Sequence, residues 1–262
     1  MTRGLAQQVR SVSRCLGIAG RSSPRRLARD AQRYWSDSRD DAYRRDLSHW
    51  AGEGRWADQA RWREIGLTHL AMFHTLCDLA GVAAPGGRML EWGPGGGANA
   101  VCFAEVFETF IGVDISEANL TECGRQLAAV GFTGFQPIAI DAPDPEAVLD
   151  RVDEPIDLFL CTAVYQHMPG REYGRRVTRC AADLFARGGV ALIQTRYPND
   201  NPTTVSKRDD YERNVLQFTA YRVEEFWTLA RACGLEPLAV KLVEETRYAY
   251  YFLRKPMEVG DE

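Results

Sequence analysis

The sequence has little of what metal-binding, disulfide-linked and membrane proteins depend on. It holds four histidines and seven scattered cysteines, and no two cysteines have the C-x-x-C spacing, so neither a zinc site nor a disulfide framework is expected. No apolar run approaches the roughly 20 residues that cross a bilayer, and the N-terminus lacks a continuous hydrophobic signal core. These absences predict a protein of the reducing cytoplasm with no membrane partner.

An excess of charge of one sign is also absent. The formal net charge is -4 over 262 residues, which gives no general attraction to polyanions, so no nucleic acid partner is expected. With 45% hydrophobic and 26% charged residues, the chain can bury an ordinary core as one domain with an appended segment. We therefore expect a globular protein, either a monomer or a homodimer.

One segment, residues 1–33, departs strongly from this balance. It carries eight arginines against a single acid, Asp30, with serines and glycines between them. This composition predicts a basic, flexible N-terminal arm. A transit peptide or an RNA-contacting tail would share the composition, but the apolar residues here form only a weak helical stripe.

Residues 34–84 are rich in tryptophan and hold four of the six in the chain. From Trp62 to Leu79, apolar residues and His69 recur at helical spacing, which predicts one long amphipathic helix packed on the rest of the protein. Pro85 and the two glycines after it are expected to end this helix. The segment as a whole is predicted to form a helical lid.

Residues 85–262 alternate between short β-like runs and helical stretches. The expected strands span residues 88–92, 109–113, 135–140, 156–161, 190–195, 236–243 and 247–254. The expected helices span residues 98–107, 117–130, 145–151, 173–186 and 223–233. Such alternation predicts an α/β fold with a doubly wound, Rossmann-like and mostly parallel sheet that is covered on both faces.

The first expected strand runs into a cluster of glycines in the stretch RMLEWGPGGGANA, residues 88–100. Glycines after a strand bring backbone N–H groups close to a ligand, because no Cβ stands in the way. From Gly93 to Ala98 the turn matches a dinucleotide-binding fingerprint, whereas from Glu91 to Gly97 it matches the acidic, alternating-glycine turn of nucleoside-cofactor methyltransferases. The glycines alone leave both alternatives open.

Acidic residues at the ends of the next two strands favour one alternative. Asp114 lies 23 residues after Glu91, where an acid can accept hydrogen bonds from both ribose hydroxyls of NAD or of S-adenosylmethionine. Asp141 ends the third strand, in position to accept a hydrogen bond from an adenine amino group, with Ala142 beside it. The acid after the third strand favours S-adenosylmethionine.

With these residues, the sequence resembles the class I S-adenosylmethionine-dependent methyltransferases of the small-molecule type. The glycine turn, the two acids and the stretches DLFLCTAVYQHMP and LFARGGVALIQT occur in the family's order and approximate spacing over residues 86–254. The resemblance implies a seven-stranded sheet whose last strand is antiparallel, with S-adenosyl-L-methionine as cofactor and S-adenosyl-L-homocysteine as product. Residues 1–80 and 196–222 lie outside it.

The resemblance also implies roles for individual residues. The implied cofactor-binding residues are Glu91, Gly93, Gly95, Gly97, Asp114, Ile115, Asp141, Ala142, Cys161 and Thr162. The glycines would line the methionine and ribose side of the cofactor, with Glu91 beneath them. Asp114 would hold the ribose and Asp141 the adenine, while Cys161 and Thr162 would face the amino acid moiety. Each acid could instead cap a turn or a helix.

Methyl transfer from a sulfonium is an in-line displacement, so the protein mainly aligns the acceptor and excludes water. A hydroxyl acceptor also needs a base within hydrogen-bond reach. His167, in YQHMPG after the fourth strand, is the first candidate base because imidazole has a suitable pKa, and His49 is the second. Similar enzymes carry one or two histidines in this stretch, and here Gln166 precedes His167, so a capping role for His167 is the alternative.

The acceptor is expected between the tryptophan-rich segment and the connection from Arg196 to Arg222, where loops commonly act as lids. The predicted substrate residues are Tyr34, Trp35, Trp50, Tyr165, Arg196 and Tyr197. Tryptophans beside charged residues suit a sugar face or an aromatic metabolite. They would equally serve to pack the long helix on the sheet.

No metal ion is expected, although one loop deserves a separate test. After the fifth strand, Asp200, Asn201 and the acidic pair at 209–210 offer oxygen ligands that suit magnesium. Polar loops of this composition are usually solvated turns. His69 and His74 lie on different faces of the long helix, one expected buried and one exposed, so they are not expected to share a metal.

We expect a methyltransferase that acts on a small molecule at oxygen, with a sugar or glycan hydroxyl ahead of a phenolic natural product. One alternative is an RNA-modifying methyltransferase, although CTAV after the fourth strand lacks the residues typical of base methylation. A second is an NAD-type oxidoreductase, although no downstream tyrosine and lysine pair is recognisable. A third is a catalytically silent S-adenosylmethionine-binding module.

Overall fold

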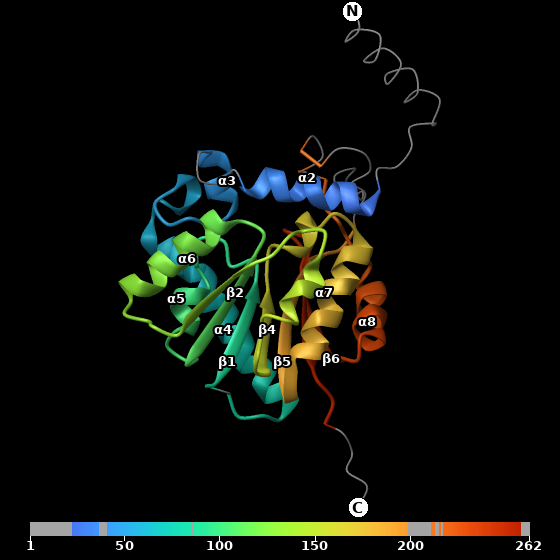
Figure 1. The fold of residues 1–262 in the computed structure, drawn as a ribbon. Coiled ribbons are helices and arrows are strands. Elements are labelled where there is room, and N and C mark those ends of the chain that lie inside the picture. Colours follow the sequence, from blue (N-terminus) through green and yellow to red (C-terminus); the bar gives the residue numbers. More distant parts are fainter. Residues whose placement is uncertain are drawn as a thin grey trace, which may run out of the picture.

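The computed structural model describes residues 23–36, 41–84, 86–198, 211–212, 215 and 217–257. A seven-stranded sheet forms the centre, with helices on both faces and further helices across the edge where the parallel strands end (Figure 1). This edge is the upper one in Figure 1. The arrangement is the predicted α/β architecture, including helices from the N-terminal region.

The strands follow the order β3-β2-β1-β4-β5-β7-β6. They are β1 (Arg88–Trp92), β2 (Thr109–Asp114), β3 (Phe135–Ala139), β4 (Ile156–Cys161), β5 (Phe185–Arg196), β6 (Glu236–Val243) and β7 (Tyr248–Arg254). Strand β7 is antiparallel to both of its neighbours, β5 and β6, whereas the pairs among β1 to β5 are parallel, which confirms the predicted antiparallel last strand. The strand order reverses between β1 and β4, and sheets of this kind bind ligands beyond the strand ends at such a point.

Helices connect the strands largely where they were expected. They are α5 (Ala100–Phe103), α6 (Glu117–Ala129), α7 (Arg171–Leu184) and α8 (Val223–Ala232), with the 3₁₀ turns η3 (Pro145–Val148) and η4 (Tyr165–His167). Helix α5 is much shorter than the expected span of 98–107, because the amides of Val106 and Phe107 both bond to the carbonyl of Phe103 and tighten the chain into a turn. The stretch 145–151 likewise forms a short 3₁₀ turn.

Strand β5 begins at Phe185, five residues earlier than the expected strand at 190–195. Helix α7 ends at Leu184, so the chain passes from helix to strand without a loop. The early part of β5 pairs with Ile156, and the register with β4 shifts before Leu158. The apolar run that follows is buried and lies between β4 and β7 in the sheet.

The N-terminal region forms α2 (Pro24–Ser36), α3 (Ala42–Leu47), the 3₁₀ turn η2 (Gly54–Trp56) and α4 (Gln59–Ala80). The side chain of Asp58 accepts from Ala60 N and caps the start of α4, and Gly81, with φ of 67°, ends it. The predicted long helix is therefore confirmed, but it ends at Gly81 and before Pro85, which lies outside the described residues. Leu79, expected on the packed face, is 49% exposed.

Two apolar clusters cover the two faces of the sheet. Successive strand residues point to opposite faces, so Met89 packs with Phe73 of α4, whereas Leu90 packs on the side of α7 and α8. The first cluster also contains Phe103 of α5 and the second contains Phe226 of α8. The long helix α4 is thus part of the core that supports the sheet.

Helix α2 lies across the carboxyl ends of the strands (Figure 1). Its buried side chains are Leu27, Ala28, Ala31, Tyr34 and Trp35, while its arginines are exposed. The expected boundary between an arm at 1–33 and a lid at 34–84 falls inside this helix. Residues 1–22 lie outside the described residues, so the flexible arm stays a prediction.

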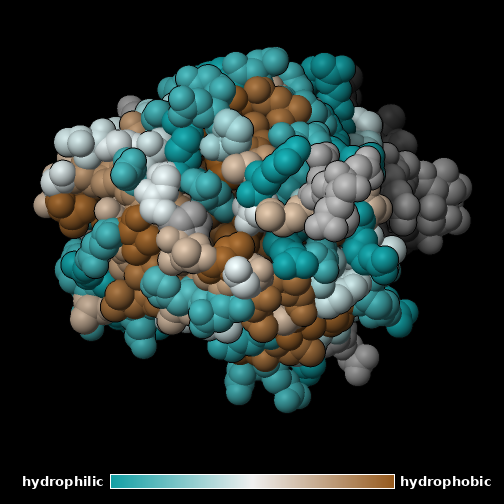
Figure 2. Space-filling model, turned by 90° about the horizontal axis from the view of Figure 1, so that it is seen from below, coloured by the Kyte–Doolittle hydropathy of each residue, from teal (hydrophilic) through white to brown (hydrophobic). Residues whose placement is uncertain are grey.

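The opposite end of the molecule is seen from below in Figure 2, where hydrophobic groups are interspersed with hydrophilic ones. Among the described residues, no helix combines the length and the apolar character that a membrane crossing requires. The six described cysteines are buried free thiols. A pocket lies at the other end of the molecule, beneath α2.

Candidate cofactor and acceptor site

A pocket lies at the carboxyl ends of β1, β2 and β4 and extends beneath α2. It encloses about 880 Å³ of empty space, part of it open to solvent. The predicted site residues that line it are Trp35, His49, Glu91, Gly93, Gly95, Asp114, Ile115, Ala142, Thr162 and His167. The structure thus brings both candidate bases and most of the expected cofactor residues to one cavity at the sheet's switch point.

The glycine turn forms one wall. Gly93 and Gly95 line the pocket with φ of 76° and 53°, a region that favours glycine, and Gly93 N donates to Val113 O at 2.7 Å. The turn is covered from outside by the N-terminal region, because Gly96 N donates to Ser48 O at 2.7 Å. Gly97 instead faces Cys123 of α6 and does not line the pocket as described.

Glu91 of β1 lies on the pocket wall and is 1% exposed. Asn99 Nδ2 donates to its Oε1 at 2.5 Å, and its Oε2 has no hydrogen-bond partner among the described residues. Burial raises the pKa of Glu91 to about 8, against the lowering effect of the Asn99 bond. The carboxyl group is therefore mostly neutral at pH 7, and a cation placed beside it would favour its ionised form.

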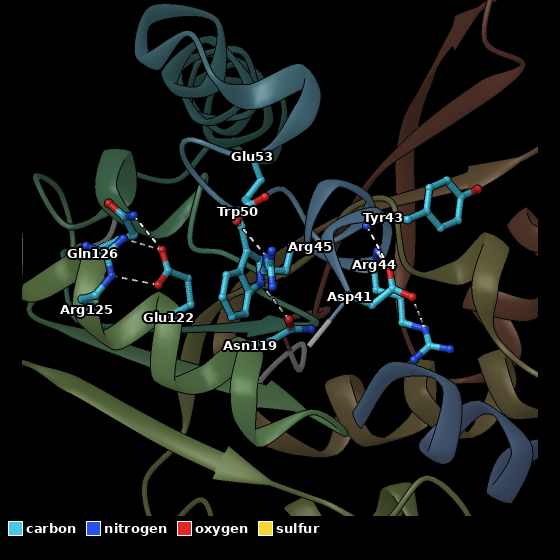
Figure 3. Close-up of polar contacts among 10 residues, drawn as sticks. All are labelled: Asp41, Tyr43, Arg44, Arg45, Trp50, Glu53, Asn119, Glu122, Arg125 and Gln126. Atoms are coloured by element: carbon cyan, nitrogen blue, oxygen red, sulfur yellow. Dashed lines mark hydrogen bonds and ion pairs between the residues drawn. The ribbon is translucent and has the colours of Figure 1, made fainter. Parts of the chain in front are cut away.

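Asp114, the last residue of β2, is held by its surroundings. Its Oδ1 accepts from Ser116 N at 2.8 Å, and its Oδ2 accepts from Asn119 Nδ2 at 3.3 Å. Burial raises its pKa to about 6, and these hydrogen bonds oppose the rise. Figure 3 shows Trp50 reaching Asn119 on α6, where Trp50 Nε1 donates to Oδ1 at 3.0 Å. Trp50 thus supports the Asp114 site from behind and does not line the pocket.

Beyond β3, Ala142 and Ile115 line the pocket, but Asp141 is exposed and does not line it as described. The Ala142 N–H donates at 2.5 Å to Gln32 Oε1 of α2, and Gln32 Nε2 donates to the carbonyl of Ile115 at 2.7 Å. One glutamine therefore bridges the ends of two strands and holds α2 against them. Cys161 is fully buried in the core, whereas Thr162 after it lines the pocket.

His167 ends η4 and is half-buried, with its ring edge-on to Trp35 at 5.3 Å between centroids. Arg196 Nε donates to Gln166 Oε1, which orients the Gln166 amide so that its Nε2 lies 3.2 Å from His167 Nε2. Because an amide nitrogen can only donate, His167 Nε2 is the accepting nitrogen of a neutral imidazole. The nitrogen that can take a proton therefore lies against Gln166.

His49 lines the pocket beside the glycine turn, with φ of 56°. Its ring meets Trp56 edge-on at 4.8 Å, and its carbonyl accepts from Trp62 Nε1 at 2.6 Å. Burial, reinforced by Arg55, lowers the pKa of His49 to about 4. A group of such low basicity is a weaker proton acceptor at neutral pH than an ordinary histidine.

Of the predicted substrate residues, Trp35 alone lines the described pocket. Tyr34 packs behind it under the Arg44 guanidinium at 4.4 Å, and Tyr165 is fully buried, with its hydroxyl 2.8 Å from Thr178 Oγ1. Tyr197 packs partly against the core. In this arrangement these tyrosines support the walls.

Arg196 also lies outside the described pocket lining. Its guanidinium stands over Phe218 at 4.0 Å and over Tyr248 at 4.6 Å, and its Nη1 donates to Thr246 O at 2.8 Å. Together with its bond to Gln166, these contacts place the arginine behind His167. In the described part of the chain it lies beside the candidate base and outside the pocket lining.

The structure adds lining residues that the sequence did not single out. Tyr211 accepts from Trp35 Nε1 at 2.8 Å and donates to His167 O at 2.5 Å, so it joins α2 to the turn after β4. Asn99 and Asn119 also line the pocket. Asn99 lies in the GANA end of the glycine stretch and could have been found there as a polar residue beside a ligand turn, whereas no local pattern marks Tyr211.

Metal ligands do not gather in the described part of the chain. No group of three or more histidine, cysteine, aspartate or glutamate side chains there could hold an ion. His69 is buried and His74 is exposed, as expected from their places on α4. The possible magnesium ligands Asp200, Asn201 and the pair at 209–210 lie outside the described residues.

A family described as a methyltransferase domain matches residues 90–193, and no curated protein matches the chain in sequence. The magnesium protoporphyrin IX methyltransferase from Synechocystis PCC 6803, solved with bound SAH, has a TM-score of 0.60 at 15% identity, covering 86% of this chain and 97% of its own. At such identity the likeness shows the fold.

Two further solved structures share this fold. An N-methyltransferase from Bradyrhizobium japonicum WM9 gives a TM-score of 0.52 at 13% identity, covering 72% of this chain and 96% of its own. An amino pentose methyltransferase from Micromonospora echinaspora, solved with SAM, gives 0.50 at 16% identity, covering 74% and 91%. The matched domain, the seven-stranded sheet and the sequence motifs agree: residues 90–193 match a methyltransferase domain, and the chain has the fold of the class I S-adenosylmethionine-dependent methyltransferases.

Proposed function

We propose that this methyltransferase transfers the methyl group to a hydroxyl of a small molecule, either a sugar or glycan or a phenolic natural product. The observation that carries the proposal is His167 in a pocket walled by the aromatic side chains of Trp35, Tyr173 and Tyr211. Aromatic faces suit sugar rings and phenols, and a histidine with one unprotonated nitrogen can accept the hydroxyl proton as the methyl group arrives.

For the cofactor, we propose that Asp114 accepts from the ribose hydroxyls and that Glu91 faces the amino group of the methionine moiety. Both carboxyls line the pocket, and Glu91 keeps one oxygen without a partner among the described residues. Asp141, Ala142 and Ile115 would surround the adenine. The sulfonium itself supplies the leaving group, so the chain has only to align the acceptor, exclude water and receive one proton.

The acceptor class is tested by incubating the protein with S-adenosylmethionine and panels of sugars, glycosides, phenols, amines and short RNAs. Mass spectrometry then detects products that gain one methyl group in place of one hydrogen. Methylation of a hydroxyl in the sugar or phenol panels supports the proposal. Methylation only of amines or of RNA would replace it. The cysteines that the structure describes are free thiols, which is consistent with the cytoplasmic location that we propose.

Binding of the cofactor is expected to release close to one proton at pH 7. Glu91, with its pKa raised to about 8, is mostly protonated in the free protein, and an ammonium group beside it favours the carboxylate. Affinity should therefore rise from pH 6 to pH 8 and level off above that. Calorimetric titration in two buffers of different ionisation enthalpy measures the proton count.

Glu91→Gln is the matched control for this linkage, because it keeps the shape and cannot ionise. The variant should bind S-adenosylmethionine more weakly and without the proton release. If it releases as many protons as the wild type, another group titrates and Glu91 does not face the ammonium group.

Gln32→Ala is expected to strengthen cofactor binding about threefold to tenfold. Gln32 uses the Ala142 N–H that the adenine would need, so the cofactor must displace one hydrogen bond of about 1 kcal/mol. Equilibrium dialysis with labelled S-adenosylmethionine measures the change, and Arg33→Ala, at an exposed position on the same helix, is the control. A weaker affinity would instead mean that Gln32 contacts the bound cofactor.

A further inference from the structure

We infer that His69 is a positioning residue for the cofactor: through Asn99, it presents Glu91 to the amino group of the methionine moiety. The inference rests on the proposed place of that amino group. It concerns a network of buried side chains that runs from β7 through α4 to the glycine turn, in which Tyr250, His69 and Asn99 are residues that the sequence motifs do not assign.

The chain of hydrogen bonds joins five buried residues from five parts of the fold. Tyr250 Oη of β7 lies 3.5 Å from His69 Nε2, and His69 Nδ1 of α4 lies 2.8 Å from Asn99 Oδ1. Asn99 Nδ2 then donates to Glu91 Oε1 at 2.5 Å and to Thr162 Oγ1 at 3.1 Å. All five residues are at most 7% exposed, so water does not compete for these contacts.

Only one arrangement of protons satisfies this chain with Glu91 as an acceptor. The NH₂ group of Asn99 donates one hydrogen to Glu91 and the other to Thr162, so its oxygen must accept from His69 Nδ1. Burial lowers the pKa of His69, so the ring is neutral and its Nε2 is left to accept from the Tyr250 hydroxyl. His69 therefore fixes which way the Asn99 amide faces.

The orientation of Asn99 decides which form of Glu91 is favoured. With the NH₂ group toward Glu91, Oε1 only accepts, and the bond favours the carboxylate. With the amide reversed, its oxygen would face Glu91 and accept a hydrogen bond from the neutral acid. His69 excludes the reversed form, because the oxygen would leave Nδ1–H without its acceptor.

The second carboxyl oxygen of Glu91, Oε2, indicates which ligand group this network serves. Oε2 has less than 1 Å² of exposed surface, has no hydrogen-bond partner among the described residues, and belongs to a residue on the pocket wall. A buried carboxylate oxygen without a partner is rare in folded proteins. The ammonium group of the cofactor supplies the missing donor. The hydrogen bonds from His69 through Asn99 favour the carboxylate form of Glu91, which pairs with that group.

The test compares two ligands on one set of variants. S-Adenosylmethionine carries the amino group, whereas methylthioadenosine has the same adenosine and lacks the amino and carboxyl groups. His69→Leu should lower affinity for S-adenosylmethionine about tenfold at pH 7 and change that for methylthioadenosine less than about twofold. The pH at which S-adenosylmethionine affinity levels off should also move upward, because the variant stabilises the neutral form of Glu91 relative to the carboxylate.

His69→Asn is the matched rescue variant, because its carboxamide nitrogen can replace Nδ1 as the donor to Asn99, and it should recover most of the affinity. Asn99→Ala removes the residue of the network that bonds directly to Glu91. If His69→Leu does not fold, this variant should show the same selective loss of S-adenosylmethionine affinity. Thermal unfolding of each variant checks that the fold is intact.

An equal loss for both ligands, no loss, or no recovery in His69→Asn would overturn the inference, since a merely structural role predicts these results. A separate result, measured on the wild-type protein, would contradict the proposed cofactor contacts themselves. If the unmodified protein binds the two ligands equally well, the amino group has no partner at Glu91, and the positioning role falls with it.

Discussion

Asp114→Ala is expected to weaken S-adenosylmethionine binding by about 100-fold or more. A carboxylate that accepts from two ribose hydroxyls makes two charge-assisted hydrogen bonds, each of about 1.5 to 3 kcal/mol. Asp114 is already oriented for this by Ser116 N and Asn119, so the free protein has little ordering left to do. Equilibrium dialysis with labelled cofactor measures the loss.

Asp153→Ala is the matched control, because the Asp153 side chain is 86% exposed and lies outside the described pocket lining. Its affinity should equal that of the wild type. Asp114→Asn separates charge from shape and should lose less than alanine does. Unchanged affinity in Asp114→Ala would contradict the ribose assignment and with it the proposed direction of the cofactor in the pocket.

His167→Ala is expected to lower turnover by about 100-fold to 10,000-fold while cofactor affinity stays within about twofold. The loss follows from removal of the base, because a sugar hydroxyl hardly ionises by itself. The acceptor found in the screen and the rate of S-adenosylhomocysteine formation provide the assay. His74→Ala, which changes an exposed histidine of α4, should leave both quantities unchanged.

Gln166 allows a sharper form of the same experiment. Since its amide donates to His167 Nε2, the acceptor hydroxyl must take the place of that amide before His167 can receive a proton. Gln166→Ala should thus keep measurable turnover, whereas His167→Ala should not. A His167→Ala variant that works at a near-normal rate would leave the imidazole with a capping role and no base assignment.

Most of the fold could be predicted because its information is local. The short, almost wholly buried runs of β1 and β4 and the helical stripe from Trp62 to Leu76 specify element type without knowledge of their neighbours. The predictions were wrong where packing and hydrogen bonds to other residues determine the local structure. Leu79 reaches the exposed side of α4, and the span 98–107 yields only a single helical turn, since backbone bonds to Phe103 close the chain toward β2.

The candidate site divides in the same way. The glycines, Glu91 and Asp114 follow strand ends, so topology alone brings them together, whereas Trp35 and Tyr211 meet across 176 positions with no shared motif. Neighbours in sequence also separate: Tyr165 turns into the core and His167 to the pocket, although both belong to the same short turn, η4. The side a residue takes in a 3₁₀ turn depends on packing that the sequence pattern does not contain.

The contacts of the glycine turn determine how long a fragment of this chain must be to keep the turn supported. A Cβ on Gly95 would lie 2.4 Å from the Ser48 carbonyl oxygen, and one on Gly96 would lie 2.5 Å from the His49 carbonyl oxygen. These two positions are kept small by the protein's own backbone, from residues far upstream of the matched domain at 90–193. A fragment trimmed to that domain would retain the glycine turn and both acids, yet the outer support of the turn would be gone.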